Sequence, residues 1–201
     1  KPLRGNGLGS WALGCLIREA VRAGLSRVML HAQCAAIGFY ERHGFSVDGP
    51  EFEEAGIGHR RMQLELSWRE AVAGIIVRPG QILLGLRAPH ITMGGRWDLF
   101  GGKIEPGESP EEALCREVEE ETSLRVKPDR LLDVILYEDA RGRCLWRCPV
   151  YRIVQWNGGV RINEEHVEAR WVTPAQMASL SLAHHRLIRL AQDALTGEGS
   201  S

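Results

Sequence analysis

Three glutamates in the middle of the chain have a spacing that could bind a metal ion. Glu117, Glu120 and Glu121 stand at positions i, i+3 and i+4, so an α-helix would place all three on one face. Like charges at this spacing repel one another and destabilise the helix unless a cation lies between them. Since sites made only of oxygen ligands suit Mg²⁺ or Mn²⁺, the spacing predicts a divalent-metal site.

The residues before these glutamates predict the helix that would carry them. Ser109 is the expected N-cap, Pro110 fits the first helical position, and Glu112 completes a capping box. We therefore expect a helix over 109–122.

The whole segment 102–124, GKIEPGESPEEALCREVEEETSL, resembles the Nudix box. That pattern is Gly, five residues, Glu, seven residues, then Arg-Glu-aliphatic-x-Glu-Glu-x-Gly-aliphatic. Ser123 departs from it, because the family has a Gly there that ends the helix in a left-handed turn. The resemblance extends over about 71–195. It implies hydrolysis of a nucleoside diphosphate linked to another moiety, by a domain with an α/β/α sandwich around a mixed sheet.

The resemblance also implies roles for single residues. Glu117, Glu120 and Glu121 would ligate the metal, while Gly101 and Gly102 would let the backbone approach the metal and the phosphates.

A loop-holding arginine and a catalytic base complete the implied site. Arg116 is expected to pair with a carboxylate, such as Glu108, and so to hold the loop rather than touch substrate. Glu165, six residues before Trp171, is the first candidate for the base. The alternatives are Glu164, Glu168 and Glu117.

Other stretches indicate the subgroup and its substrate. The residues ILLGLRA at 82–88 and Gly95-Arg96-Trp97 look most like MutT-type enzymes, which cleave a nucleoside triphosphate to the monophosphate and pyrophosphate. Phe100 stands where many of them have Pro, and 179–186 lacks the Asn that reads an oxidised guanine. The sequence therefore does not specifically support 8-oxo-dGTP as substrate.

Two residues are candidates for direct substrate contact. Arg87 could meet a phosphate, or it could be a solvated arginine at the end of a strand. Trp97 could stack on a base, or it could be buried in the core.

The beginning of the chain resembles a different family. A glycine-rich run, RGNGLG at 4–9, precedes a helical pattern, and such loops bind pyrophosphate through backbone N–H groups. The run and the residues up to 66 look like the C-terminal half of a GNAT-type N-acetyltransferase, close to ElaA-like members. By that resemblance Arg4, Gly7 and Gly9 would bind acetyl-CoA, and Tyr40 would protonate the leaving thiolate; Tyr40 as an aromatic core contact is the alternative.

This acetyltransferase-like segment is expected to be incomplete. The fold needs strands before the glycine-rich loop, and a half-sheet exposes an unpaired edge. The Nudix-like half, a second copy of the chain in a homo-oligomer, or upstream sequence could cover that edge. The chain also begins without Met, so we expect a fragment or a trimmed product whose first half has no useful acetyltransferase activity.

The composition of the chain excludes some kinds of binding partner and metal site. The 201 residues carry a formal net charge of -1, which argues against a dedicated nucleic-acid or membrane surface. A small nucleotide remains compatible with that charge. Five cysteines with no Cys-x-x-Cys pair argue against a zinc site and fit reduced thiols in a cytoplasmic protein.

The composition and the turn and helix-end residues along the chain predict two domains, 1–67 and 70–196, in an α/β (α+β) protein. In the first we expect a helix over 11–23, a strand over 27–31, a short helix over 34–43 and strands at 45–47 and 61–66. In the second we expect a hairpin of 71–77 with 81–86, then strands over 131–137 and 144–154 joined by a turn at 139–142. A strand at 169–172, a small helix from Thr173-Pro174, a helix over 184–195 and a disordered tail at 197–201 should follow.

Two other functions compete with the leading hypothesis of a Mg²⁺-dependent Nudix hydrolase. The first is an acetyl-CoA-dependent N-acetyltransferase with an accessory Nudix domain. The second is a non-catalytic nucleotide sensor, against which the full set of Glu117, Glu120 and Glu121 argues.

Overall fold

A computed structural model of the chain describes residues 7–138 and 145–196. The chain divides into two compact units, one of 1–69 with 136–145 and one of 70–135 with 146–201. Of the segment 136–145, the structure describes residues 136–138 and 145. The expected turn at 139–142, Cys144 and the tail at 197–201 lie outside the described residues.

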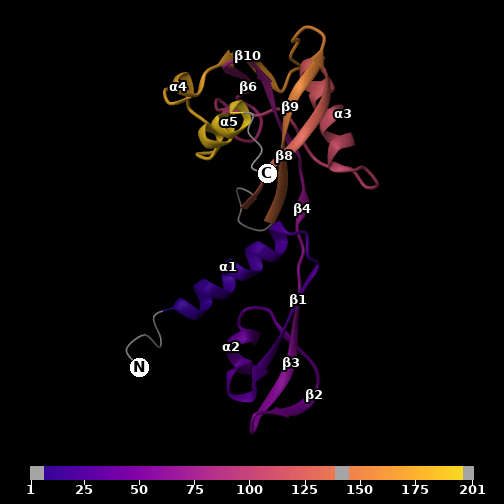
Figure 1. Ribbon diagram of the computed structural model, residues 1–201, viewed down its shortest axis with the longest axis vertical. Coiled ribbons are helices and arrows are strands. Elements are labelled where there is room, and N and C mark those ends of the chain that lie inside the picture. The colour runs from indigo at the N-terminus through magenta and orange to yellow at the C-terminus, as the bar shows by residue number, and fades with distance from the viewer. Residues whose placement is uncertain (1–6, 139–144, 197–201) are drawn as a thin grey trace. The chain divides into compact units, whose positions relative to one another are not determined.

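The first unit is a small antiparallel sheet with helices (Figure 1). Its sheet order is β1-β3-β2, and Leu13, Ala32, Phe45 and Met62 form its buried core. The elements are α1 (Leu8–Arg22), β1 (Arg27–Gln33), a 3₁₀ turn (Cys34–Ala36), α2 (Ile37–Glu41), β2 (Ser46–Glu54) and β3 (Ile57–Glu65).

The β2–β3 hairpin is longer than the sequence predicted. The expected strands covered only 45–47 and 61–66, whereas pairing continues as far as Glu54 opposite Ile57. Ala55 and Gly56 both have positive φ, at 52° and 76°, as a tight hairpin turn with the twist of its strands requires. The first turn residue is Ala55 and not Asn, Asp or Gly, so the usual sequence pattern of a hairpin turn is missing and the hairpin was not predicted.

The second unit is built on a mixed sheet. The sheet order is β10-β6-β5-β9-β4, with β7 paired to β6 and β8 to β9. β5 pairs with β9 in parallel, with Ala73 opposite Val150, whereas β6 pairs with β5, β7 and β10 antiparallel. The strands are β4 (Arg69–Glu70), β5 (Ala73–Arg78), β6 (Gln81–Arg87), β7 (Trp97–Asp98), β8 (Arg125–Glu138), β9 (Leu145–Asn157) and β10 (His166–Val172).

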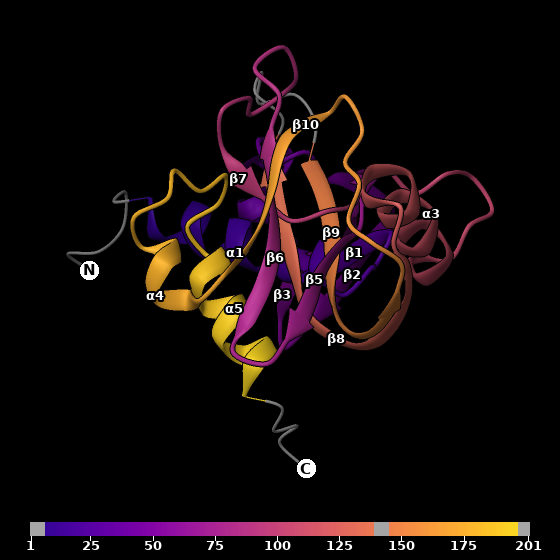
Figure 2. The same cartoon turned by 90° about the horizontal axis from the view of Figure 1, so that it is seen from above.

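Helices cover both faces of this sheet, as the α/β/α expectation required. The helices are α3 (Pro110–Thr122), α4 (Pro174–Met177) and α5 (Leu187–Leu195). Figure 2 shows α3 and α5 on opposite sides of β5, β6 and β9. Leu114 and Val118 of α3 belong to one buried cluster, and Leu187 and Leu190 of α5 belong to the other.

The local signals of the second unit hold in the structure. The β5–β6 hairpin turns at Pro79-Gly80, and Ser109 caps α3 in a capping box with Glu112. The expected helix over 184–195 starts only at Leu187, because His184–Arg186 form a turn in which the Arg186 N–H donates to His184 Nδ1. No helix among the described residues is long and apolar enough to cross a membrane.

Candidate active site

Two carboxylates of α3 face the glycine pair before the helix. The Gly101 N–H donates a hydrogen bond of 2.8 Å to Glu121 Oε2, and the Glu121 side chain is buried. A Cβ on Gly102 would lie only 2.6 Å from Glu117 Oε1, so the Glu117 carboxylate packs directly against this glycine.

Gly101 has a conformation that only glycine adopts without strain. Its φ is +144°, and a Cβ there would come within 2.7 Å of the Ala73 Cα and still closer to the Val72 carbonyl oxygen. The Gly102 carbonyl accepts a hydrogen bond of 2.8 Å from the Val72 N–H. The double glycine thus lets the loop lie against β5 while its first N–H holds Glu121.

The electrostatic surroundings of Glu121 connect several candidate residues. Burial first, and then the charges of Glu165 and Glu117, raise the pKa of Glu121 to about 8, against the Gly101 hydrogen bond, which lowers it. The charge of Arg87 lowers the same pKa. Glu117, Glu121, Glu165 and Arg87 are therefore close enough to share one local field, and a cation there would relieve the repulsion between the acids.

Arg116 holds the loop in the way that the sequence suggested. Its Nε and Nη2 donate to the two carboxylate oxygens of Glu108 at 2.8 and 2.9 Å, and Nη2 also reaches the Lys103 carbonyl at 3.1 Å. The hydrogen bonds from Arg116 lower the pKa of Glu108 to about 2. Arg116 also donates to Glu117 Oε1 at 2.9 Å, so it restrains one carboxylate of the site.

Glu120 stands apart from the other two carboxylates. Its side chain is 58% exposed, and its Oε2 lies 3.5 Å from Arg116 Nη1. Within 7–138 and 145–196, no three His, Cys, Asp or Glu side chains come together as a metal-binding group. The expected convergence of Glu117, Glu120 and Glu121 is thus not present in this structure. The oxygen donors of Glu117 and Glu121 suit a hard cation, but Glu120 would have to turn away from Arg116 to join them.

The loop before β10 carries the candidate base. Glu165 is exposed, its N–H donates to Asn163 Oδ1 at 3.0 Å, and its charge acts on Glu121. Glu168 is instead paired with Arg170 at 2.6 Å. Among the loop carboxylates, this proximity to Glu121 favours Glu165 over Glu168 and Glu164.

The two candidate substrate contacts differ in their surroundings. Arg87 lies at the site: its Nε donates to the Thr92 carbonyl at 2.8 Å, and its side chain is 18% exposed. Trp97 is only 6% exposed and belongs to the core cluster beside α5, with the Arg170 guanidinium 4.9 Å from its ring centroid. The suggestion that Trp97 stacks on a base is therefore wrong, and the alternative of core burial is the one that the structure shows.

The structure describes three of the four acetyl-CoA candidates of the first unit. Arg4 lies outside the described residues. Gly7 has a left-handed conformation just before α1, and Gly9 lies in the first turn of α1 against the ring of Phe39. Tyr40 makes edge contacts to Phe39 and Phe45, with ring centroids 5.1 and 5.8 Å apart, which is the aromatic core contact given as its alternative role.

One buried polar residue near the site was not singled out from the sequence. His166 is 4% exposed, and within the described part of the chain neither of its ring nitrogens has a hydrogen-bond partner. Burial, followed by the charge of Arg87, lowers its pKa to about 4. In the sequence, His166 is simply the first residue of the strand HVEARWV. Polar residues are common at the ends of strands, so this position did not mark it as buried.

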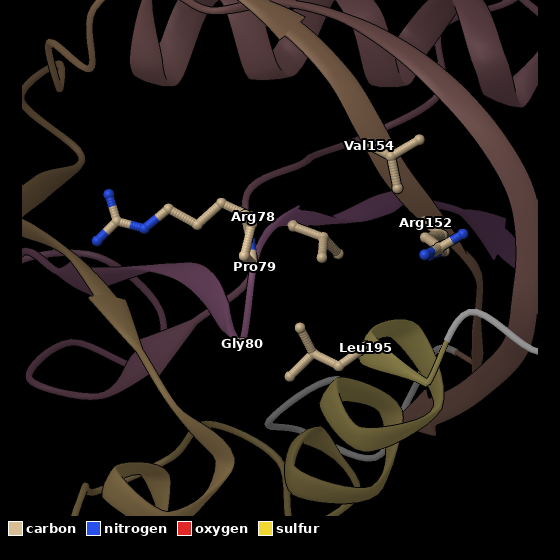
Figure 3. Close-up of a pocket in the computed structure, with 7 residues that line it drawn as sticks. Arg78, Pro79, Gly80, Arg152, Val154 and Leu195 are labelled. Atoms are coloured by element: carbon tan, nitrogen blue, oxygen red, sulfur yellow. The ribbon is translucent and has the colours of Figure 1, made fainter.

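A separate hollow of about 280 Å³ lies at the β5–β6 turn (Figure 3). Its arginines are engaged elsewhere: Arg152 Nε donates to the Ala194 carbonyl at 2.7 Å, and the Arg78 guanidinium lies 4.4 Å from the Trp171 ring centroid. None of the candidate site residues lines this hollow. Its lining residues are Val77, Arg78, Pro79, Gly80, Arg152, Val154 and Leu195.

Comparison with family models assigns both parts of the chain. Residues 68–191 match the NUDIX domain, and residues 1–66 match the acetyltransferase (GNAT) domain. Both matches agree with the resemblances found in the sequence.

Individual relatives cover the second unit. The chain is 38% identical over 133 residues to a MutT-like protein of Streptomyces ambofaciens, covering 64% of this chain and 78% of the relative. It is 31% identical over 114 residues to the CTP pyrophosphohydrolase of Escherichia coli K12, covering 57% and 82%.

Solved structures agree with these relatives. A MutT NUDIX hydrolase of Burkholderia pseudomallei is 30% identical with a TM-score of 0.53, over 67% of this chain and all of that one. A MutT protein of Methanosarcina mazei is 27% identical with a TM-score of 0.57, over 67% of this chain and 99% of that one. Given the fold, the capped acidic helix and these matches, the chain belongs to the NUDIX domain family and is a Nudix hydrolase.

Proposed function

We propose that the second unit cleaves a nucleoside triphosphate to the monophosphate and pyrophosphate, using Mg²⁺ or Mn²⁺. The observation that carries this proposal is the packing of the Glu117 and Glu121 carboxylates against Gly101 and Gly102, with Glu165 in the same local field. The names of two relatives, CTP pyrophosphohydrolase and nucleoside triphosphatase, support the substrate class.

The residues present fit a cation through their oxygen donors. Glu117, Glu120 and Glu121 would hold it, with Glu120 leaving Arg116. A bound divalent cation supplies neutralisation of phosphate charge and a lower pKa for its water.

The chain's own residues supply the remaining chemistry. Gly101 and Gly102 leave room for phosphate oxygens beside the backbone, and the Arg116–Glu108 pair keeps this loop in register with α3. Glu165 accepts a proton from the attacking water while the water oxygen forms a bond to phosphorus. The bond from that phosphorus to the leaving phosphate oxygen breaks on the opposite side, in line with the attack. Glu117 is the alternative base.

A screen of nucleotides with Mg²⁺ tests the proposed reaction, with products identified by chromatography. Glu120→Gln should lower the turnover rate by about 10²-fold or more, because it removes a charged ligand. Glu119→Gln is the matched control, since Glu119 lies on the same helix but pairs with Arg125 at 3.0 Å. Equal turnover in both variants and the wild type would remove the metal role of Glu120.

A second pair of variants tests the base. Glu165→Gln should reduce turnover by about 10²-fold and remove the acidic limb of the pH–rate profile, whereas Glu164→Gln, the adjacent change in the same loop, should not. If Glu164→Gln causes the larger loss, or if neither variant loses activity, the base is a different residue, with Glu117 next to be tested.

The match of residues 1–66 to the GNAT domain supports a second candidate function, acetyl transfer from acetyl-CoA to an amine. We propose that this first unit has no useful activity of this kind; the partly buried ring of Tyr40 packs against Phe39 and Phe45. Robust acetylation of a polyamine or peptide amine by the chain, abolished in Tyr40→Phe, would refute this.

A further inference from the structure

His166 occupies a slot between two strands and the glycine loop. Its ring centroid lies 4.9 Å from that of Phe100, at an interplanar angle of 52°. A Cβ on Gly85 of β6 would come within 2.9 Å of His166 Nε2, so the ring fills the space that this glycine leaves open. Figure 2 shows β6 and β10 side by side, and their register pairs His166 with Arg87.

The two ring nitrogens of His166 form no hydrogen bonds with the described residues. A buried donor or acceptor without a partner destabilises the folded state, because it loses its hydrogen bonds to water. An apolar side chain of similar size would fill the slot without that cost. The imidazole is therefore suited to a state in which its nitrogens do find partners.

The position of the ring indicates that this state is the one with substrate bound. His166 directly follows Glu165, the candidate base, and its ring touches Phe100, which directly precedes Gly101. Gly101 in turn holds Glu121. A register irregularity separates His166 from Glu168 in the pairing with β6, and such bulges re-aim neighbouring side chains. The ring thus links the segment of the base to the loop that holds an acidic ligand.

We propose that His166 is a positioning residue for the hydrolysis: with substrate bound, its ring nitrogens form hydrogen bonds that fix the Glu165 segment against the Phe100–Gly102 loop. This rests on the proposed function, since it assigns His166 to the same reaction. Because the ring is buried, the partners are groups or water molecules brought in when the site fills. The effect should fall on the chemical step and not on nucleotide binding.

Three variants of the full chain separate this role from simple packing. His166→Leu removes the polar atoms, whereas His166→Asn and His166→Gln keep a donor and an acceptor near the positions of Nδ1 and Nε2. We expect His166→Leu to match or exceed the wild-type melting temperature while kcat falls about tenfold or more and KM changes little. One of the two amide variants should recover most of kcat.

The outcomes decide the question in both directions. Wild-type kcat in a folded His166→Leu, or amide variants that lose kcat as far as the leucine variant does, would show that His166 only fills the core. If His166→Leu does not fold, the ring-nitrogen resonances of the wild type, described next, decide the question.

A spectroscopic measurement separates this inference from the proposed function. Absence of nucleotide hydrolysis by the wild type refutes the proposed function. The ¹⁵N resonances of the His166 ring, recorded with Mg²⁺ and a non-hydrolysable CTP analogue, test the inference without turnover. A shift of a ring nitrogen on addition supports it, and unchanged resonances at saturating analogue overturn it.

Discussion

Alanine at Gly101 and alanine at Gly102 should damage the protein in opposite ways. Gly101 has φ of +144°, and its added Cβ would press on backbone atoms of Val72 and Ala73. Backbone cannot yield locally, so Gly101→Ala should destabilise the fold. Gly102 has no positive φ, and the three atoms nearest its added Cβ would be those of the carboxyl group of the flexible Glu117 side chain. Gly102→Ala should leave the fold intact and displace that carboxylate.

The size of each effect follows from these contacts. A side chain held at such a φ costs about 1–3 kcal/mol, and with the added clash we expect about 3 kcal/mol for Gly101→Ala, or roughly 10 °C in melting temperature. For Gly102→Ala, the carboxylate must retreat by about 1 Å, and a misplacement of that size in a catalytic group costs about 10²-fold in rate. Its melting temperature should stay within about 2 °C of wild type.

Thermal unfolding and Mg²⁺-dependent nucleotide turnover, measured on both variants, check this pair. Arg116 Nη1 donates to Glu117 Oε1 at 2.9 Å, so a displaced carboxylate would also disturb this hydrogen bond. Wild-type turnover in a stable Gly102→Ala would show that the placement of Glu117 beside the glycine is not used. A Gly101→Ala variant as stable as the wild type would refute the reasoning about the loop.

Two further predictions concern the loop and the helix end. Because hydrogen bonds from Arg116 lower the pKa of Glu108 from 4.5 to about 2, this pair stabilises the fold above about pH 4.5, and its contribution is lost as the pH falls toward 2. Urea midpoints should therefore decline less over this range in Glu108→Gln than in the wild type; equal declines would contradict the pairing. Ser123 ends α3 with φ 60° and ψ 15°, so Ser123→Gly should stabilise the fold by about 1 kcal/mol and raise the melting temperature by a few degrees; a lower value would show that the 3.4 Å contact from its Oγ to the Arg161 carbonyl matters more.

Local sequence signals determined several parts of this protein correctly. The start of α3 follows from Ser109, Pro110 and Glu112, because a capping box is made within four residues. The β5–β6 hairpin follows from Pro79-Gly80 for the same reason. The family resemblance led us to expect that Arg116 pairs with a carboxylate such as Glu108, and the structure has this pair.

Only the tertiary structure decided which side chains are buried and which meet. Trp97 lies in the core because β7 pairs with β6, a contact that no periodicity in a two-residue strand could predict. His166 is buried because Gly85 and Phe100, which are distant in sequence, leave space for its ring. Glu120 lies near Arg116, whereas Glu121 accepts a hydrogen bond from Gly101. Helix spacing fixes which residues share a face, but the partners of each side chain depend on strands brought together from far along the chain.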